Sequence, residues 1–585
     1  MSWSVVRCGE PTRAGLCDRT TDNQQPTTPI DIHDIKRFKE DPAIKELIRA
    51  GNTIGCFYVE SPAMRMLLKK LKVDDYLGLV AASSIIRPGV AESGMMREYL
   101  LRHNDPERIK LAPPELLRIM PETYGVMVYQ EDVLKVAHHY AGLDLEEADI
   151  LRRGMSARFR DRPEFKEVER KFFANCKSKG HPDAEAAEIW RQIESFASFS
   201  FAKGHSASYA VESYQSLYLK AHHPLEFLVG VANNFGGFYR TEFYLHEAKR
   251  AGAVIEAPCV NASEELCSLV KGNDQLSVVG YTVAQASVRE DVRRNNGQPT
   301  TNNSIHLGLG NIKGLTTEVA QLVLRERRRN GSFADLPDLL RRVPLHVEQA
   351  RILVRVGALR FTGRSKPELL WDLALMHQGS KSADPIPDLF VMKVEAPRLP
   401  DLQHYPLADA YDELELLGFP LCDPFTLVEC RSDDQTMRRS EDGNAIPRRQ
   451  FPIVGRDGRL LGNVPGAART MQTATSTTDN EQPTFLARQM SSHIGQRVTM
   501  LGYMIHVKTT TTSTGSYMSF GSFIDPAGDF WDSTQFPSVA ERFPFRGRGV
   551  YRLTGYVEEE FGHCALRTQH IEKLPWKPDP RYGET

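Results

Sequence analysis

Several features that would narrow the function are scarce or absent in these 585 residues. The nine cysteines are scattered, and pairs such as Cys259 with Cys267 are too widely spaced for a Cys-x-x-Cys zinc site. We therefore expect reduced thiols in a cytoplasmic protein. No apolar run reaches the roughly 18 to 20 residues that span a bilayer. The N-terminal 28 residues also lack the apolar core of a signal peptide, so no membrane partner is expected.

An excess of one charge sign is missing as well, because 73 basic residues stand against 75 acidic ones. The net charge of −2 gives no general indication of a nucleic-acid partner, and any basic surface must be local. Residues 311–360 are such a place, since they hold ten Lys or Arg against five Asp or Glu. This local excess is typical of a surface that binds a nucleic-acid backbone.

The length predicts roughly three to five domains, and the patterning divides the chain. Helical spacing dominates the first half, with a short strand expected at "TIGCFYVES", and alternating strands dominate the end. The fold class is therefore multidomain and mainly α, followed by a C-terminal all-β module. The expected divisions are an unmatched, disordered 1–30, a helical 31–300, a basic helical 301–362, a connector 363–492, a β-barrel 493–575 and a tail 576–585.

The segment "FAKGHSASYA", residues 201–210, places Lys203 and His205 just before a predicted helix with Ser206 as its N-cap. The helix is expected to continue to Pro224. A helix N-terminus next to two basic side chains favours an anion, most usefully a phosphate. The alternative is a solvated lysine beside a histidine that packs locally.

A second basic pair, Arg152 with Arg153, lies at the end of a helix in "LEEADILRRG". Adjacent helical side chains point about 100° apart, so both can serve one ligand only if it lies over the helix end. A triphosphate is large enough, and the guanidinium fork suits its oxygens. The alternative is a solvated basic helix terminus.

The segment "GLGNIKGL" precedes a helix inside the basic block and predicts a turn that grips DNA phosphates without reading sequence. The residues expected to contact DNA are Gly310, Ile312, Lys313 and Gly314. A purely structural helical pair with a solvated face is the alternative.

Seven stretches in order resemble one known family. They are "TIGCFYVESPAMRMLLKKL", "IIRPGVAESGMM", "ETYGVMVYQEDVLKVA", "ADILRRGMS", "SFAKGHSASYAVESYQSLYLKAHHPLEF", "GLGNIKGL" and "ELELLGFPLCDPF". From about residue 30 to 574 the chain is similar to the bacterial DNA polymerase III alpha subunit, a C-family replicative polymerase, from its fingers onward.

The resemblance implies roles for the matching positions. It identifies 31–300 as fingers, 301–362 as a tandem helix-hairpin-helix motif and 493–575 as an OB-fold. Incoming deoxynucleoside triphosphate (dNTP) would be bound by Arg152, Arg153, Phe199, Lys203 and His205. Phe199 stands where the family usually has tyrosine, so the ring is kept and the hydroxyl is lost.

An OB-fold binds single strands by aromatic stacking and backbone charge. The candidate contacts are Tyr503, Lys508, Tyr517 and Phe520, with core packing of the aromatic rings as the alternative. In "IPDLF", Leu389 and Phe390 resemble the sliding-clamp-binding peptide of the family, although Ile386 replaces its usual leading glutamine. The alternative is a local hydrophobic contact.

The implied function is DNA-templated DNA synthesis with Mg²⁺, primer–template DNA, the sliding clamp and other replicase subunits. Nucleotidyl transfer needs carboxylates that hold two metal ions, and the family carries them in the palm as Asp-x-Asp. This sequence contains no Asp-x-Asp, so we assign no catalytic or metal-binding residue and expect the chain to be inactive alone. Three explanations of the missing Asp-x-Asp pair stay open. The gene is truncated or frame-shifted, or a separate polypeptide carries the palm and PHP domains, or the chain is a non-enzymatic DNA-binding or clamp-associated remnant.

Overall fold

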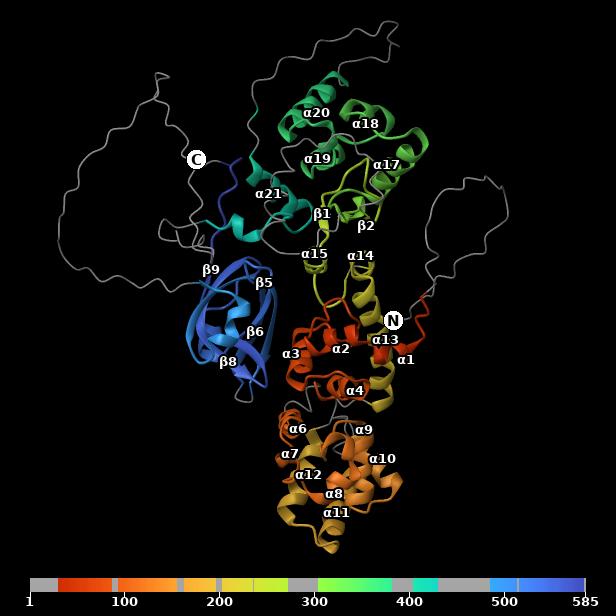
Figure 1. Ribbon diagram of the computed structural model, residues 1–585, viewed down its shortest axis with the longest axis vertical. Coiled ribbons are helices and arrows are strands. Elements are labelled where there is room, and N and C mark those ends of the chain that lie inside the picture. The colour runs from red at the N-terminus through yellow and green to blue at the C-terminus, as the bar shows by residue number, and fades with distance from the viewer. Residues whose placement is uncertain are drawn as a thin grey trace, which may run out of the picture.

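The computed structural model describes residues 30–86, 93–154, 162–195, 202–234, 236–271, 303–380, 402, 405–429, 484–512 and 515–582. Figure 1 shows an elongated arrangement of helical groups along the vertical axis, with a β-barrel at one side. The predicted positions Phe199, Leu389 and Phe390 lie outside the described residues. The fold class expected from the sequence is confirmed.

Two helical groups build the N-terminal part. The first contains α1 (Ile35–Glu40), α2 (Pro42–Arg49), α3 (Pro62–Leu71) and α4 (Tyr76–Ile85). The second contains α6 (Met95–Asn104), α7 (Pro106–Ile109), α8 (Pro114–Ile119), η1 (Pro121–Thr123), α9 (Gln130–Lys135), a π-helical turn η2 (Val136–Tyr140), α10 (Leu145–Gly154), α11 (Pro163–Ser178) and α12 (Asp183–Ser195).

Side-chain caps fix where several of these helices begin. Asp41, Ser61 and Asp75 accept hydrogen bonds from backbone N–H groups in the first turns of α2, α3 and α4. Such caps satisfy N–H groups that have no partner inside a helix. One apolar core joins the two groups and continues into α13.

Helix α13 (Lys203–His222) is twenty residues long and packs against α1, α2 and α4. It ends where the sequence predicts, because Pro224 opens the next helix, α14 (Pro224–Asn233). Helix α15 (Thr241–Arg250) packs on α14. Neither α13 nor any other helix in the described ranges is long and apolar enough to cross a bilayer.

The strand expected at "TIGCFYVES" is wrong, because these residues form consecutive turns. Gly55 and Tyr58 have φ angles of +85° and +66°, which lie in the left-handed region and are incompatible with a strand. The Thr53 hydroxyl donates to the carbonyl of Val59 at 2.6 Å and closes the loop. An apolar run alone could not distinguish a buried loop from a strand.

A small sheet leads into the basic helical block. Its strands β1 (Val254–Glu256), β3 (Ser304–His306) and β2 (Ser268–Val270) lie in the order β1-β3-β2. The block follows as η4 (Leu309–Asn311), α17 (Thr317–Asn330), α18 (Leu336–Arg342), α19 (Val347–Arg355), η5 (Arg360–Thr362) and α20 (Lys366–Ser380). Helix α21 (Pro406–Leu416) packs on α19, and η6 (Pro424–Leu427) comes next.

Five strands close a barrel at the C-terminal end. They are β5 (Arg497–Thr511), β6 (Tyr517–Ile524), β7 (Phe530–Gln535), β8 (Val550–Glu560) and β9 (His563–Lys573), with β4 (Thr484–Phe485) added beside β5. The pairing runs β5-β6-β7-β9-β8 and returns to β5, so no edge of the barrel stays open. Alternate residues such as Val498, Met500 and Leu553 fill its core. This topology is that of the predicted OB-fold.

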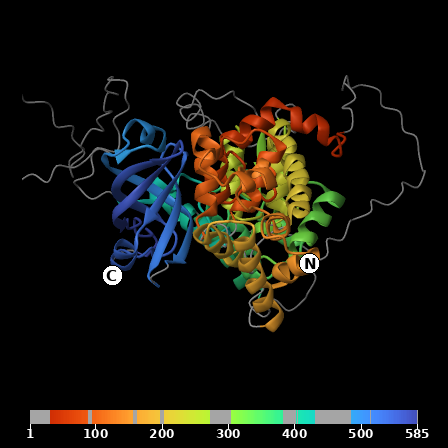
Figure 2. The same cartoon turned by 90° about the horizontal axis from the view of Figure 1, so that it is seen from below.

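The barrel rests on the helical part, as Figure 2 shows from below. Its β6–β7 turn receives a hydrogen bond from His246 to the carbonyl of Gly528 at 3.0 Å. The Arg65 guanidinium of α3 lies 4.9 Å from the ring centre of Phe530. An ion pair also joins Lys70 of α3 to Glu560 of β8. These contacts place the barrel beside α3 and α15.

Candidate nucleotide and nucleic-acid sites

Lys203 and His205 lie in the first turn of α13, one step further into the helix than expected. Ala202 is the N-cap and provides no side-chain hydrogen bond, so the prediction that Ser206 caps the helix is wrong. Ser206 is buried instead, and its hydroxyl is 2.5 Å from that of Ser84 in α4. The sequence could not identify the N-cap from Ser206, because a serine hydroxyl near a helix start can make a hydrogen bond in the core as well as cap the helix.

Carboxylates surround the Lys203 side chain and backbone. Its Nζ lies 2.6 Å from each oxygen of Glu122 in η1. Its backbone N–H donates to the Glu131 carboxylate of α9 at 3.0 and 3.2 Å. Its Nζ is also 5.4 Å from the ring centre of Tyr129, whose pKa burial raises. Lys203 is thus held in one position by groups far away in the sequence.

The two arginines at the end of α10 bind one carboxylate. Arg152 Nη2 and Arg153 Nη2 lie 2.7 and 2.6 Å from the two oxygens of Asp149, one turn earlier in the helix. The hydrogen bond from Arg152 holds the pKa of Asp149 below its ordinary value, and Arg153 adds to this effect. Both guanidinium groups remain partly accessible, with 38% and 63% of their side-chain surface exposed.

Helix α9 connects the two basic clusters. It packs on α10, which carries the arginines, and its Glu131 accepts from the start of α13. Both clusters therefore have contacts with α9. Asp149 and Glu122 pair with the three cationic side chains, so an incoming anion with several oxygens would compete with these two carboxylates for existing donors.

The acidic members of this arrangement were missed from the sequence. Asp149 could have been found, because residues three and four apart on a helix are neighbours. Glu122 and Glu131 had no such signal, since they lie 81 and 72 residues before Lys203. Only the fold brings them to the start of α13.

The hairpin "GLGNIKGL" forms η4 and a turn before α17, whose N-cap is Thr316. Ile312 is buried and anchors the turn, whereas Gly310, Lys313 and Gly314 are exposed. Gly314 has a φ of +81°, which favours glycine. The sequence predicts that this turn grips DNA phosphates. The N–H groups of Gly310 and Lys313, however, donate to the carbonyls of Glu265 and Leu416, so these two N–H groups are not free to bind a phosphate.

Ion pairs offset much of the charge in the basic block. Arg327 pairs with Glu264 at 2.5 Å, and Arg342 pairs with Glu326 at 3.0 Å. Arg325 and Arg329 are exposed one turn apart on α17. Fewer basic side chains are therefore available to a DNA backbone than the ten Lys or Arg residues counted at 311–360.

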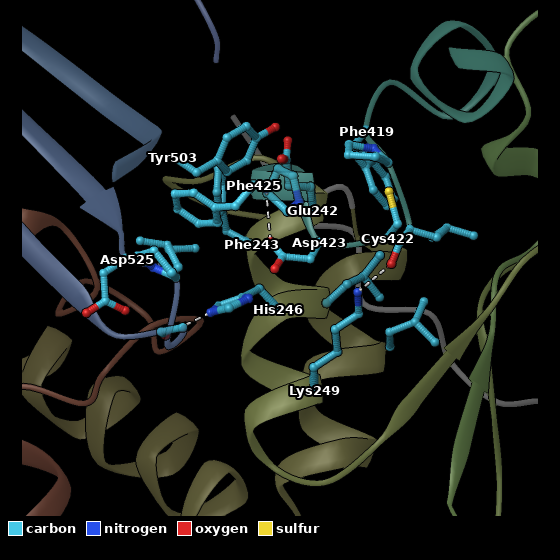
Figure 3. A pocket seen from close by; sticks show the side chains of 18 of the residues that line it. Glu242, Phe243, His246, Lys249, Phe419, Cys422, Asp423, Phe425, Tyr503 and Asp525 are labelled. Carbon is cyan, nitrogen blue, oxygen red and sulfur yellow. Dashed lines mark hydrogen bonds between the residues drawn. The ribbon is translucent and has the colours of Figure 1, made fainter. Parts of the chain in front are cut away.

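Tyr503 is unsuited to base stacking, because only 5% of its surface is exposed. It lines a cavity of about 250 Å³ between α15, residues 419–425 and the β6–β7 turn. Figure 3 shows its ring close to Phe425 and to Glu242. Burial and the Glu242 carboxylate raise the pKa of Tyr503. This ring belongs to the junction between barrel and helices.

The other barrel candidates divide between two faces. Lys508 of β5 and Phe520 of β6 are cross-strand partners, so their side chains share a face. Both are exposed, Phe520 to 41%. Tyr517 lies three residues before Phe520 on the same strand and therefore faces the other way. It borders a separate hollow with Phe543 and Phe545.

Comparisons with known proteins agree with this architecture. The model of the bacterial DNA polymerase III alpha subunit finger domain matches residues 15–180, and that of a helix-hairpin-helix motif matches residues 252–369. Over these residues the chain is similar to the bacterial DNA polymerase III alpha subunit. The finger-domain match includes Glu122, Glu131 and the arginine pair, and the helix-hairpin-helix match includes the hairpin before α17.

Curated relatives carry polymerase names. The DNA polymerase III subunit alpha of Aquifex aeolicus is 31% identical over 348 residues, which are 59% of this chain and 27% of the relative. The error-prone DNA polymerase of Methylococcus capsulatus is 32% identical over 57% of this chain and 31% of the relative. The DNA polymerase III subunit alpha of Staphylococcus aureus is 29% identical over 65% and 33%. The chain thus spans about a third or less of these relatives.

Proposed function

We propose that this chain supplies the incoming-nucleotide site and the DNA-binding modules for DNA-templated DNA synthesis by a DNA polymerase III alpha subunit. The observation that carries the proposal is that α10, which bears Arg152 and Arg153, packs on α9, and that Glu131 of α9 also accepts from the backbone of Lys203 at the start of α13. The guanidinium and ammonium groups of these three basic side chains suit the phosphate oxygens of a dNTP. His205, exposed in the same turn as Lys203, and Phe199 complete the proposed pocket.

The DNA contacts in this proposal come from two modules. Lys313 and the exposed glycines of the hairpin touch the duplex backbone, while Lys508 and Phe520 bind a single strand on one face of the barrel. Tyr517 is a contact on the opposite face of β6 and serves a different segment of the strand. Tyr503 is left out of this set because it is buried.

We further propose that Leu389 and Phe390 bind the sliding clamp as hydrophobic anchors. Replacing both by alanine is expected to abolish clamp capture in a pull-down while leaving DNA binding unchanged. Equal capture by the variant would refute this assignment. The other replicase subunits are proposed as partners only because the chain resembles this polymerase family.

We assign no catalytic Mg²⁺ site to this chain. Among the parts of the chain that the structure describes, no group of three or more His, Cys, Asp or Glu could hold a metal ion. We propose that the metal-binding carboxylates come from a palm outside these 585 residues, and no catalytic step is assigned to side chains of this chain.

Primer extension with the purified chain and Mg²⁺ tests the proposal together with two binding measurements. We expect dNTP binding, salt-sensitive binding of primer–template DNA, and extension only after a palm-containing polypeptide is added. DNA binding without any dNTP binding would favour the alternative of a non-enzymatic DNA-binding protein. Extension by this chain alone would show that its catalytic carboxylates had been overlooked.

A further inference from the structure

The loop between α14 and α15 holds one aromatic ring at the surface. Phe238 is 45% exposed, whereas the next residue, Tyr239, is 6% exposed. A single exposed phenylalanine is common on protein surfaces and by itself indicates no function. Phe238 differs from such residues in how its backbone is held and in which side chains its ring contacts.

Two buried side chains hold the backbone of this loop. The N–H of Phe238 donates to the Glu60 carboxylate at 2.5 Å. The N–H groups of its neighbours Gly237 and Tyr239 donate to the Tyr244 hydroxyl at 2.8 and 3.0 Å. The same hydroxyl donates to Glu60 at 3.0 Å. Because three successive N–H groups are bound in this way, the Phe238 ring cannot move into the core without breaking these hydrogen bonds.

The Phe238 ring meets the barrel at β5. Its centre lies 4.7 Å from that of His506, and the ring planes are 63° apart. His506 pairs with Ser522 of β6, and Lys508, two residues further along β5, pairs with Phe520. Side chains two residues apart on a strand share a face, so His506 lies on the face that carries Lys508 and Phe520. Phe238 therefore extends the barrel face that we propose for a single strand.

Cations accompany this row of side chains. Lys508 is exposed on the row itself. The Arg240 guanidinium, two residues after Phe238, donates to a backbone carbonyl of β5 at 3.4 Å and lies 3.4 Å from Glu242. Burial, and then the charges of Lys508 and Arg240, lowers the pKa of His506, so both cations act where the loop meets the barrel. A DNA single strand offers phosphates to such cations and flat bases to exposed rings.

We propose that Phe238 stacks on one base of a DNA single strand that continues along the barrel face to Phe520. This assignment rests on the function proposed above, in which Lys508 and Phe520 bind a single strand, and it adds a stacking residue from the helical part. Diagonal neighbours on paired strands are about 7 to 8 Å apart, so the two rings lie on the order of 10 Å from each other. A few nucleotides of one strand reach both rings. An apolar segment of a protein would use the rings and leave the cations unmatched.

Primer–template DNA with a thymidine overhang tests this path, because the duplex fixes the register of the overhang. In the full chain, Phe238→Ala is expected to weaken binding about tenfold in fluorescence anisotropy, the usual loss of one stacked base. Phe238→Leu keeps apolar bulk without an aromatic face and should show the same loss, whereas Phe238→Tyr should bind like wild type. Trp371→Ala, at a 48% exposed ring of α20, is the matched control. Unchanged binding of a blunt duplex reports that each variant is folded.

Single abasic sites along the overhang identify the stacked base. We expect one position whose abasic substitution weakens wild type about tenfold but does not weaken Phe238→Ala further. A different position, a few nucleotides away, should be coupled in the same way to Phe520→Ala. Coupling to Phe520 alone, or wild-type binding by Phe238→Leu, would overturn the role of Phe238 and leave the barrel contact standing. Coupling to neither residue would refute the proposed single-strand site as a whole.

Discussion

Lys203 Nζ lies 2.6 Å from both carboxylate oxygens of Glu122, although 81 residues separate them in the chain. The pair is partly exposed, at 35% and 39% of the two side chains, so it adds little to stability. Its main effect is to occupy the ammonium group that we propose for the triphosphate. A nucleotide must displace Glu122 or share Lys203 with it.

Glu122→Gln is therefore expected to tighten dNTP binding several-fold, because a neutral amide competes less well for Lys203. The free energy of unfolding should change by less than about 1 kcal/mol. Calorimetric titration with a dNTP measures the affinity, and Glu107→Gln, whose partner Lys110 lies outside the proposed site, is the control. Weaker binding in Glu122→Gln would mean that the glutamate positions Lys203 for the nucleotide.

Lys313→Gln tests the hairpin. The exposed ammonium group is expected to contact a phosphate, so its loss should weaken primer–template binding to a similar extent for all sequences. The slope of log affinity against log salt should fall by about 1. Fluorescence anisotropy at several salt concentrations measures both values. An unchanged slope, like that expected for Lys110→Gln, would remove Lys313 from the DNA surface.

Phe520→Ala and Tyr503→Phe separate the two kinds of aromatic residue in the barrel. Phe520→Ala should weaken binding of an oligothymidylate about tenfold, since one stacked base contributes about 1 to 3 kcal/mol. Tyr503→Phe should leave this affinity unchanged, because the ring is buried beside Phe243. The opposite pattern would mean that the barrel moves away from α15 before it binds a strand.

A buried histidine of β9, His563, gives the barrel an acid-sensitive stability. Burial, and then the charges of Lys69, Lys70 and Arg65, lowers the pKa of His563 to about 4, while Asp532 opposes this shift. Between about pH 6.5 and pH 4 the unfolded chain binds a proton at this residue that the folded chain does not. The free energy of unfolding therefore falls as the pH drops through this window, by about 3 kcal/mol in total.

Urea unfolding, followed at the buried indole of Trp531 in β7, measures this dependence. His563→Gln should flatten the profile between about pH 6.5 and pH 4, whereas His377→Gln, at an exposed position on α20, should not. A profile that stays equally steep in His563→Gln would assign the acid sensitivity to other groups.

Much of the fold could be predicted because its signals are local. The end of α13 follows from Pro224, and the alternating pattern near the end of the chain predicted the all-β module that β5, β6, β8 and β9 form. The turns at 53–61 could not be predicted, since their left-handed residues follow from tertiary packing and not from the apolar composition of the run. The division of the chain into domains remains a prediction.

The candidate sites were harder to predict for the same physical reason. A sequence shows which side chains carry charge, but it does not show which opposite charges the fold brings to them. Lys203 was found from its neighbours along the chain, whereas its carboxylate partners at 122 and 131 come from other helices. Likewise, strand alternation could separate the faces of Tyr517 and Phe520, but the burial of Tyr503 depends on α15.

Helix α13 is a continuous rod of about 30 Å, given a rise of about 1.5 Å per residue. Lys203 is at one end, and at the other Lys220 binds Glu247 of α15 at 3.2 Å, with 8% and 10% of the side chains exposed. The next helical turn of α15 places Arg250 3.6 Å from Asp529 of the barrel. A tilt of about 5° at the Lys203 end would displace the far end by about 2.6 Å. A small rotation of α13 at the proposed nucleotide site would therefore cause a larger displacement near the α15 contacts that hold the barrel.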